Sequence, residues 1–490
     1  MNRQRENLIV LVMLGLAAMH CDGTSDFISG IDDGGGTSPP PGDSSDAGSG
    51  DDGTSGGNGD DDGSTGNPFP GSEGGAPSDA GPIADGAPST TEGGTTGDGA
   101  AGGPWAGLKV SGTTFVDSTG QEIILRGLGL GEWFNTESYM INVDSPDQGG
   151  MGETKFRNAL VQAMGQAGAD QFFATWEANI VAPSDVALWA TWGVNSIRLP
   201  INYHSISTAD GQYIDAGFQK IDAFVALCKA QHIYVILDLH AAPGAQNCEQ
   251  MSDSPDGIAH LWKEPTSYRQ WTIDVWQTIA ARYANEPAVG GYDIFDEPYD
   301  TETDGTFSTG EGTLRQMYLD ITAAIRKVDP NHILFFEGTD WSSIDTSTNG
   351  FTALLPAWDP QMAWSFHKYW DNNTTAAIQP YLDLRTTSNR PIWNGETGED
   401  TKQGWSGAMI ALLEANKVGW NEWTYKKSGG QTTNPYTIPD PANWSAMATY
   451  LAKGGTPPAN ATQTMMALAD NAATAKCTYN AAWVKEVFNK

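Results

Sequence analysis

The sequence predicts an α/β fold of the (β/α)8 TIM-barrel class, with a short β-hairpin in front of the barrel. Short apolar runs alternate with amphipathic helical stretches at the spacing of βα units across residues 105–490. That length suits one large barrel with generous loops. A doubly wound sheet would also alternate, but it usually carries a glycine-rich phosphate turn, which this chain lacks. The expected barrel strands are Ile124–Leu130, Ser196–Pro200, Tyr234–His240, Gly291–Glu297, Ile333–Glu337, Ala363–Tyr369, Ile392–Glu396 and Val418–Trp423.

The segment before the first barrel strand has the pattern of a small β-hairpin. Apolar and polar residues alternate in Leu108–Val110, Thr114–Val116 and Glu122–Leu125. Turn residues separate these runs, at Gly112 and around Gly120. We therefore expect the globular domain to begin near residue 105 with this hairpin.

Residues 1–21 are typical of an export signal. Arg3 and Arg5 precede the apolar run Leu8–Ala18, which is too short to remain in a bilayer as a spanning helix. Cys21 follows and resembles the lipid-modified cysteine of bacterial lipoproteins, although Met19-His20 departs from the small residues expected there. Lipid anchoring at Cys21, simple cleavage and another kind of anchor all remain open. Each of these outcomes places the protein outside the cell or on its surface.

Residues 22–104 are expected to form a disordered linker. They consist mainly of Gly, Ser, Thr, Pro and Asp, contain almost no aromatic residues, and have no Lys or Arg. Such a segment cannot bury enough apolar surface to offset the entropy of ordering its backbone. We expect it to add reach between the N-terminal segment and the catalytic domain of residues 105–490.

Composition argues against a nucleic-acid partner. The formal net charge is −34, and nucleic-acid binding needs clustered Lys and Arg, so no nucleic-acid partner is expected. A neutral ligand fits an acidic chain best. The 18 Trp and 15 Tyr suggest surfaces on which sugars stack, although most of these rings must lie in the core. We expect a monomer that binds a polysaccharide or oligosaccharide.

The four cysteines are too few for a disulfide scaffold, and none are spaced as CxxC, the arrangement that would indicate a zinc site. Cys228 lies in an apolar helical run and is expected to be a buried thiol. Cys248 and Cys477 would be able to pair in an oxidising compartment, and the sequence leaves that pairing open.

Polar residues gather at the ends of the predicted strands. In a TIM barrel the chemistry lies at the C-terminal ends of the strands, so this placement marks a candidate site. Any one polar residue there is explained by the strand simply ending, but the whole set is not. The residues are Arg198, His240, Asp296, Glu297, Glu337, His367, Tyr369, Glu396 and Trp423.

Two glutamates at the ends of separate strands are what glycoside hydrolysis requires. One carboxyl group protonates the leaving oxygen, and the other attacks the sugar or directs water. Glu297 and Glu396 each follow an apolar run. In an enzyme that retains configuration the two carboxyl groups would lie about 5–5.5 Å apart.

Several strings resemble family 5 glycoside hydrolases, the cellulase-type family of retaining enzymes. They are IRLP at 197–200, LDLH at 237–240, FDEP at 295–298, FHKY at 366–369, NGETGE at 394–399 and WTYK at 423–426. The resemblance spans the chain from about Leu108 to its end. It implies a (β/α)8 barrel with Glu297 as acid/base and Glu396 as nucleophile, and neither metal nor cofactor.

The same resemblance implies roles for further residues. Arg198 would brace the nucleophile, and Tyr369 would hydrogen-bond to it. His240 and His367 would bind the sugar at the cleaved bond, and Trp423 would stack beneath that sugar. The family normally has asparagine before the acid/base, whereas this chain has Asp296. An ionised Asp296 would accept hydrogen bonds but not donate them, and would add a third carboxylate to the site.

One string is a decoy for the catalytic acid. Asn285-Glu286-Pro287 spells the family's usual acid/base triplet, but it follows the helical stretch Ile279–Tyr283 and leads into a strand. We therefore expect Glu286 to lie at the surface and to be inert.

Two further strings resemble the exo-β-1,3-glucanase branch of the family. They are LGEWFNTESYM at 130–140 and HAAPGAQN at 240–247. That likeness implies that Glu137 helps to close the site around a terminal glucose. Glu132 stands where glycine is usual and Ser138 where proline is usual, and 144–152 has the character of an extra loop. Linkage preference and endo or exo action therefore stay open.

The leading hypothesis is retaining hydrolysis of a β-glucan, either cellulose-type or β-1,3-linked. A mannan-directed or glycolipid-directed β-glycosidase is the alternative within the same chemistry. A catalytically dead sugar-binding protein on the same barrel, or an adhesin displayed on the linker, is the alternative from another class. The presence of both carboxylates argues against the catalytically dead protein.

Overall fold

A computed structural model describes residues 107–143, 150–208, 212–299, 310–342, 350–369, 372–398, 404–430 and 433–489. The predicted export signal at 1–21, with Cys21, and the predicted linker at 22–104 lie outside these ranges. So does most of the extra loop expected at 144–152. Within the described ranges, no helix combines the length and apolar character needed to cross a membrane.

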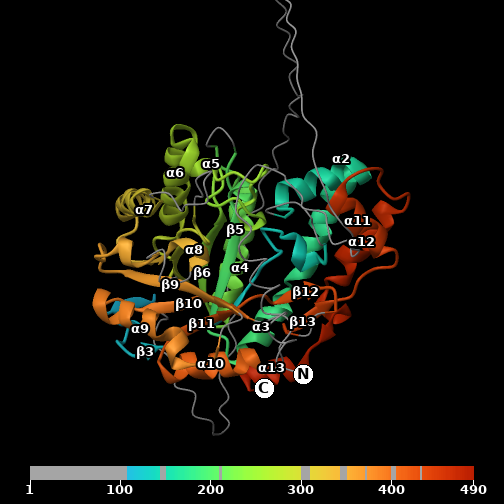
Figure 1. Cartoon of the computed structure of the whole chain (residues 1–490). Coiled ribbons are helices and arrows are strands. Elements are labelled where there is room, and N and C mark those ends of the chain that lie inside the picture. The colour runs from blue at the N-terminus through green and yellow to red at the C-terminus, as the bar shows by residue number, and fades with distance from the viewer. Residues whose placement is uncertain are drawn as a thin grey trace, which may run out of the picture. The chain divides into compact units, whose positions relative to one another are not determined.

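The core of the fold is a closed barrel of parallel strands, as the sequence predicts. Within the described residues eight strands form it, in the spatial order β10-β11-β4-β5-β6-β7-β8-β9. Figure 1 shows these strands at the centre of the molecule with helices around them. The strands are β4 (Arg126–Gly129), β5 (Ser196–Asn202), β6 (Tyr234–Ala241), β7 (Val289–Asp293), β8 (Ile333–Glu337), β9 (Met362–Tyr369), β10 (Ile392–Gly398) and β11 (Gly419–Glu422).

Each predicted barrel strand overlaps an observed one, because buried parallel strands are continuous apolar runs. The largest difference concerns β7, which ends at Asp293 rather than at Glu297. After Asp293 the backbone leaves the sheet, and Glu297 adopts a left-handed conformation with φ of 42°. The acid/base candidate therefore lies on the loop after β7 and not on the strand itself.

An outer ring of helices covers the barrel. Helix α4 shows the reason: Phe218, Ile221, Val225 and Cys228 lie on one helical face and are all buried against the sheet. Cys228 is a buried free thiol, as predicted. The ring contains α3 (Pro183–Trp192), α4 (Asp215–Ala230), α6 (Pro265–Tyr283), α7 (Gly310–Arg326), α9 (Thr375–Ser388), α10 (Trp405–Ala415) and α13 (Ala481–Phe488), with the short α5 (His260–Lys263) and α8 (Thr339–Ser342).

A three-stranded sheet closes the N-terminal end of the barrel, where a hairpin was predicted. It consists of β1 (Lys109–Ser111), β2 (Thr114–Val116) and β3 (Glu122–Ile123). Leu108 and Phe115 from this segment pack in one buried cluster with Tyr234 and Ile333, the first residues of β6 and β8. The cluster plugs the end of the barrel opposite to the predicted site.

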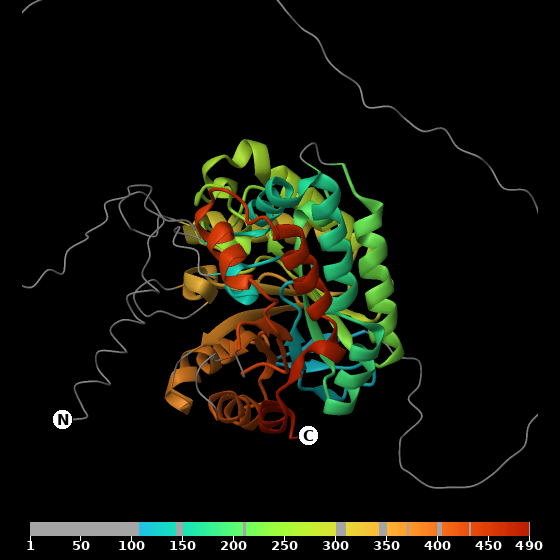
Figure 2. The ribbon, with the colours of Figure 1, turned by 90° about the vertical axis from the view of Figure 1, so that its right-hand side faces the viewer.

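Further elements pack beside the barrel. Figures 1 and 2 show α2 (Glu153–Ile180) beside α11 (Trp444–Lys453) and α12 (Ala461–Asn471). Asn179 of α2 donates a 2.9 Å hydrogen bond to the carbonyl of Ala469 in α12. A small sheet of β12 (Lys426–Ser428), β13 (Tyr436–Ile438) and β14 (Thr478–Tyr479) follows the last barrel strand. None of these elements was predicted from the sequence.

The pairing of Cys248 with Cys477 that the sequence leaves open is not formed. Cys477 is a free thiol, and its Sγ lies 3.4 Å from the carbonyl oxygen of Asn471. This contact lies at the C-terminal end of α12, whereas Cys248 is not among the free thiols.

Candidate active site

Arg198 on β5 is the centre of the predicted site. Its side chain is completely buried, and its guanidinium group faces carboxylates from four other strands or the loops after them. The five N–H donors of a guanidinium group allow it to serve several acceptors at once. Its partners are Asp238 at 3.2 Å, Asp293 at 2.9 Å, Asp296 at 3.0 Å and Glu337 at 3.3 Å, together with Glu396.

Glu396 lies on β10 and is held on both of its carboxylate oxygens. Arg198 Nη1 donates to Oε1, and the Tyr369 hydroxyl donates to Oε2 at 2.8 Å. The pairing of β10 shifts register between Asn394 and Glu396, a bulge that sets the direction of this side chain. Burial raises the pKa of Glu396, while the charges of His367 and Arg198 oppose that rise.

Glu297 lies across the barrel mouth from Glu396. Its backbone N–H donates to Glu337 Oε2 at 2.8 Å, and its Oε1 lies 2.6 Å from His367 Nδ1. Burial raises its pKa well above the ordinary value, and the neighbouring charge of Asp296 raises it further. The two glutamates therefore differ in their surroundings. Glu396 is paired with the guanidinium group of Arg198, whereas burial and the charge of Asp296 favour the protonated form of Glu297.

The separation of the two glutamates matches a retaining glycosidase. His367 Nδ1 is 2.6 Å from Glu297 Oε1 and 3.6 Å from Glu396 Oε2. One carboxylate oxygen of Glu297 lies within 4.8 Å of one from Glu396. Retaining enzymes place the two carboxyl groups about 5–5.5 Å apart, and inverting enzymes about 6.5–9.5 Å apart. An oxygen–oxygen approach within 4.8 Å is what the shorter range requires.

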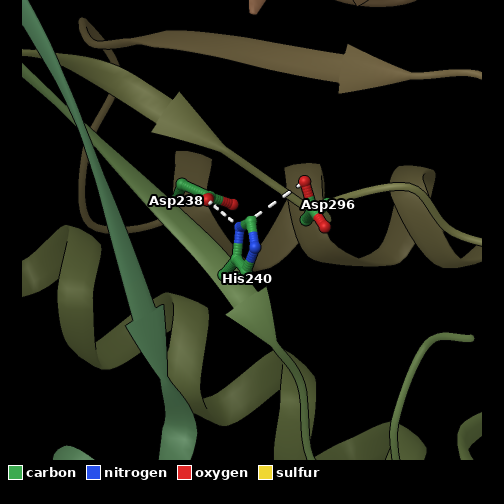
Figure 3. Close-up of side chains that lie close together, drawn as sticks. All are labelled: Asp238, His240 and Asp296. Carbon is green, nitrogen blue, oxygen red and sulfur yellow. Dashed lines mark hydrogen bonds and ion pairs between the residues drawn. The ribbon is translucent and has the colours of Figure 1, made fainter. Parts of the chain in front are cut away.

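His240 at the end of β6 is fixed by acidic neighbours. Figure 3 shows its ring between Asp238 and Asp296, with Nδ1 2.7 Å from Asp238 Oδ2 and 3.5 Å from Asp296 Oδ1. Its Nε2 makes no hydrogen bond within the described residues and lies 3.4 Å from Glu137 Oε1. Burial raises the pKa of Glu137 to about 7.

Trp423 follows β11 and packs against His240. The two rings are stacked, with centroids 5.2 Å apart and planes at 16°. The indole Nε1–H of Trp423 donates to the Tyr139 hydroxyl at 2.7 Å, which fixes the orientation of the ring. An aromatic ring is thereby placed beside His240, with the Arg198 guanidinium carbon 6.0 Å from its centroid.

Asp296 is buried between the cation and the histidine. Its Oδ1 accepts a 3.0 Å hydrogen bond from Arg198 Nη2. Burial raises its pKa to about 7, the charge of His240 opposes that rise, and the charge of Glu396 adds to it. Asp296 therefore changes its protonation state near neutral pH.

The structure brings every predicted site residue to one end of the barrel and separates the decoy from them. Glu286 precedes β7, at the opposite end of that strand from Glu297, and its carboxylate pairs with Lys229 at 2.9 Å. Sequence reasoning missed Asp238 and Asp293, which complete the surroundings of Arg198. A signal was present for Asp238: it stands two residues before His240, and alternate residues of a strand share a face.

Some of these side chains are close enough to share a cation. Asp238, His240 and Asp296 each offer one ligand atom, and these atoms lie within 4.8 Å of one another. Arg198 already contacts both aspartates, so a guanidinium group supplies the positive charge at this place.

Comparisons with known proteins find similar chains. The model of the family described as Cellulase (glycosyl hydrolase family 5) matches residues 158–429. A beta-xylosidase from Phanerodontia chrysosporium is 29% identical over 361 residues, which cover 66% of this chain and 72% of the relative. A probable glucan 1,3-beta-glucosidase A from Emericella nidulans is 28% identical over 296 residues, which cover 58% and 67% of the two chains.

A solved structure shares the overall architecture. The crystal structure of endogalactoceramidase matches with a TM-score of 0.53 and 16% identity, covering 78% of this chain and 84% of the other. At that identity the likeness shows the barrel fold alone.

Proposed function

Since the chain belongs to glycosyl hydrolase family 5, we propose that it is a β-glucan hydrolase in which Glu396 is the nucleophile and Glu297 the acid/base. One observation carries the assignment of these two residues. Carboxylate oxygens of Glu297 and Glu396 approach within 4.8 Å in a buried site, and their surroundings differ in charge. That arrangement suits double displacement with retention of configuration.

In the first step a carboxylate oxygen of Glu396 bonds to the anomeric carbon as the glycosidic C–O bond breaks. Glu297 gives its proton to the departing oxygen, so the leaving group departs as an alcohol. The hydrogen bond from Tyr369 and the pairing with Arg198 favour the ionised Glu396 that this step needs. Burial and the charge of Asp296 favour the protonated Glu297.

In the second step water attacks the glycosyl ester on Glu396. Glu297, now ionised, takes a proton from that water, and the bond between the sugar and Glu396 breaks. His367 lies within 3.6 Å of both carboxylates, so it helps to hold them in place through both steps.

The remaining predicted residues bind the sugar at the cleaved bond. We assign hydroxyl recognition to His240, whose buried Nε2 lacks a hydrogen-bond partner within the described residues, and to Asp296 and Glu137. The face of Trp423 supports the sugar ring. A β-glucan substrate is supported by the likeness to the probable glucan 1,3-beta-glucosidase A of Emericella nidulans. The relative named beta-xylosidase is, by its name, also an enzyme that acts on a β-glycoside.

A nucleophile variant tests the assignment. Glu396→Gly should abolish hydrolysis of an aryl β-glucoside, and added azide should restore turnover and give a glycosyl azide of inverted configuration. Glu286→Gln is the matched control and should keep wild-type activity, because Glu286 lies at the other end of β7. Near-normal activity of Glu396→Gly without azide would refute the assignment. Product analysis on cellulose, β-1,3-glucan, mixed-linkage glucan and mannan then identifies the linkage.

Localisation is a separate proposal. We propose that the protein is exported, on the basis of the charged and apolar pattern of residues 1–21, and that it acts as a monomer. Incorporation of labelled palmitate into the wild type but not into Cys21→Ser would show lipid anchoring. A soluble, unlabelled protein in the medium would show simple cleavage instead.

A further inference from the structure

Three side chains form a second polar and aromatic cluster at the barrel mouth. Glu249 follows β6, Tyr299 follows β7, and Trp341 lies in α8 after β8. The Tyr299 hydroxyl donates to Glu249 Oε1 at 2.7 Å, and Trp341 Nε1 donates to the same oxygen at 3.3 Å. The two aromatic rings also touch, with centroids 4.9 Å apart. We call these three residues the Glu249 cluster.

The cluster is tied directly to the proposed acid/base. The side chain of Asn247 donates to the Glu297 carbonyl at 3.0 Å and accepts the Glu249 N–H at 2.9 Å. Tyr299 is two residues beyond Glu297, and its own N–H donates to the Gln246 carbonyl at 3.0 Å. Hydrogen bonds thus join the loop after β6 to the loop after β7. These bonds hold the backbone of Glu249 in place relative to the backbone of Glu297.

The barrel order places the cluster across the mouth from the sugar-binding residues. Trp423 follows β11 and Glu137 follows β4, and in the closed barrel these neighbouring strands lie opposite β7 and β8. The sugar attacked by the nucleophile is proposed to lie on the side of Trp423. The part of the substrate that departs with the proton of Glu297 must then extend to the other side, where the Glu249 cluster lies.

The chemistry of the cluster suits a hydroxylated group. Glu249 Oε1 accepts two hydrogen bonds, whereas its Oε2 has no partner among the described residues. Glu249 and Trp341 are both only half-buried, whereas Tyr299 is buried behind them. A fixed carboxylate oxygen with free lone pairs accepts hydrogen bonds from sugar hydroxyls, and an adjacent indole ring offers a stacking face.

The backbone conformation at Trp341 and Ser342 also indicates a functional role for the cluster. Trp341 and Ser342 both have left-handed conformations, with φ of 53° and 52°. Such conformations are costly for residues other than glycine and tend to occur at functional sites. The Ser342 hydroxyl donates to the Ser365 carbonyl at 2.8 Å, which helps to hold the turn that presents the Trp341 ring.

We propose that Glu249, held by Tyr299 and Trp341, forms the subsite for the leaving sugar and makes the enzyme selective for hydroxylated leaving groups. The inference rests on the proposed function, because it needs Glu297 to be the proton donor. Glu249 is a specificity-determining residue in this scheme and takes no part in bond breaking.

The test compares two leaving groups in the full-length protein. We would measure kcat/KM for a β-linked gluco-oligosaccharide and for a 4-nitrophenyl β-glucoside, each at the pH optimum of the variant concerned. Glu249→Gln should lower kcat/KM on the oligosaccharide about ten- to hundred-fold, the range for losing hydrogen bonds to a charged group. The loss on the aryl glucoside should be several-fold smaller. Glu286→Gln should leave both values unchanged.

The outcomes separate the inference from the proposed function. If Glu249→Gln lowers kcat/KM equally on both substrates, Glu249 acts only through the charge or position of Glu297. The leaving-group subsite is then refuted. Tyr299→Phe, which removes only one anchor of Glu249, should show a weaker selective loss on the oligosaccharide. If the wild type hydrolyses neither substrate, the proposed function itself has failed.

Discussion

Replacing Asp296 by asparagine should shift the pH dependence of the enzyme. The family usually has asparagine at this place, whereas the buried Asp296 carries a pKa raised by burial to about 7. Its Oδ1 already accepts a hydrogen bond from Arg198, and asparagine oxygen can accept the same bond. The variant should therefore fold normally and lose only the charge.

The size of the shift follows from the charge beside Glu297. Ligand atoms of Asp296 and Glu297 each approach within 4.8 Å of His367, so the two carboxylates are close. At an effective dielectric constant of about 20, two unit charges about 6 Å apart repel by about 3 kcal/mol, or about two pKa units. Above pH 7 most of this repulsion is present in the wild type and helps to keep Glu297 protonated. Removing it should move the alkaline limb down by about one to two pH units.

The acid limb should move less. Below pH 7 Asp296 is protonated and neutral, so replacing it by asparagine should change the pKa of Glu396 little. The measurement is kcat/KM against pH for wild type and Asp296→Asn, which reports the acid and base of the free enzyme. If the two profiles superimpose, Asp296 is not coupled to the catalytic carboxylates. If the alkaline limb instead moves up, a protonated Asp296 is the form that supports catalysis in the wild type.

Three further predictions concern stability. Glu132→Gly should raise the free energy of unfolding by about 1–3 kcal/mol. The reason is that Glu132 is buried with φ of 69°, and neither of its carboxylate oxygens has a hydrogen-bond partner within the described residues. A Tm lower than that of the wild type would contradict this. A protein that begins at Gly102 should keep the Tm and kcat of the full chain, and a loss of several degrees would show that the preceding segment packs on the barrel. The pKa values of Glu137, Asp238 and Asp293 are raised by burial to about 7, so the folded chain holds protons that the unfolded chain releases above about pH 4.5. Calorimetry at constant ionic strength should therefore show Tm falling as the pH rises from about 4.5 through 7, and a rising Tm would refute this.

The barrel was predictable because its strands are recorded as apolar runs with polar ends. The position of Glu297 was less so, since Ile294 and Phe295 prolong the apolar run after β7 has ended at Asp293. Periodicity cannot show where the backbone turns out of a sheet. The helices α2, α11 and α12 and the small C-terminal sheet were missed for a related reason, because they are additions to the regular βα repeat.

The site was predictable in its residues but not in its charges. Arg198, Glu297 and Glu396 were identified from strand ends and from the family resemblance. The number of acids around Arg198 was not predicted, because Asp238 and Asp293 lie within the apolar runs, and only the closed barrel turns them towards one point. The Glu249 cluster was missed because its members come from three segments that are far apart in the sequence and share no motif.

The charge balance around Arg198 links catalysis to stability. One guanidinium group faces five carboxyl groups in a buried site, so full ionisation would leave several negative charges without compensation. Some of these acids must therefore hold protons in the folded protein, and the same condition keeps Glu297 in its acid form. Raising the pH should then weaken the fold and remove the catalytic proton together. Asp296→Asn separates the two effects, since it removes one buried acid, which favours stability at alkaline pH, while it lowers the pKa of Glu297. We would compare the Tm and the activity of Asp296→Asn and wild type at pH 8. A higher Tm together with a larger loss of activity in the variant would show that the charge of Asp296 supports catalysis and destabilises the fold.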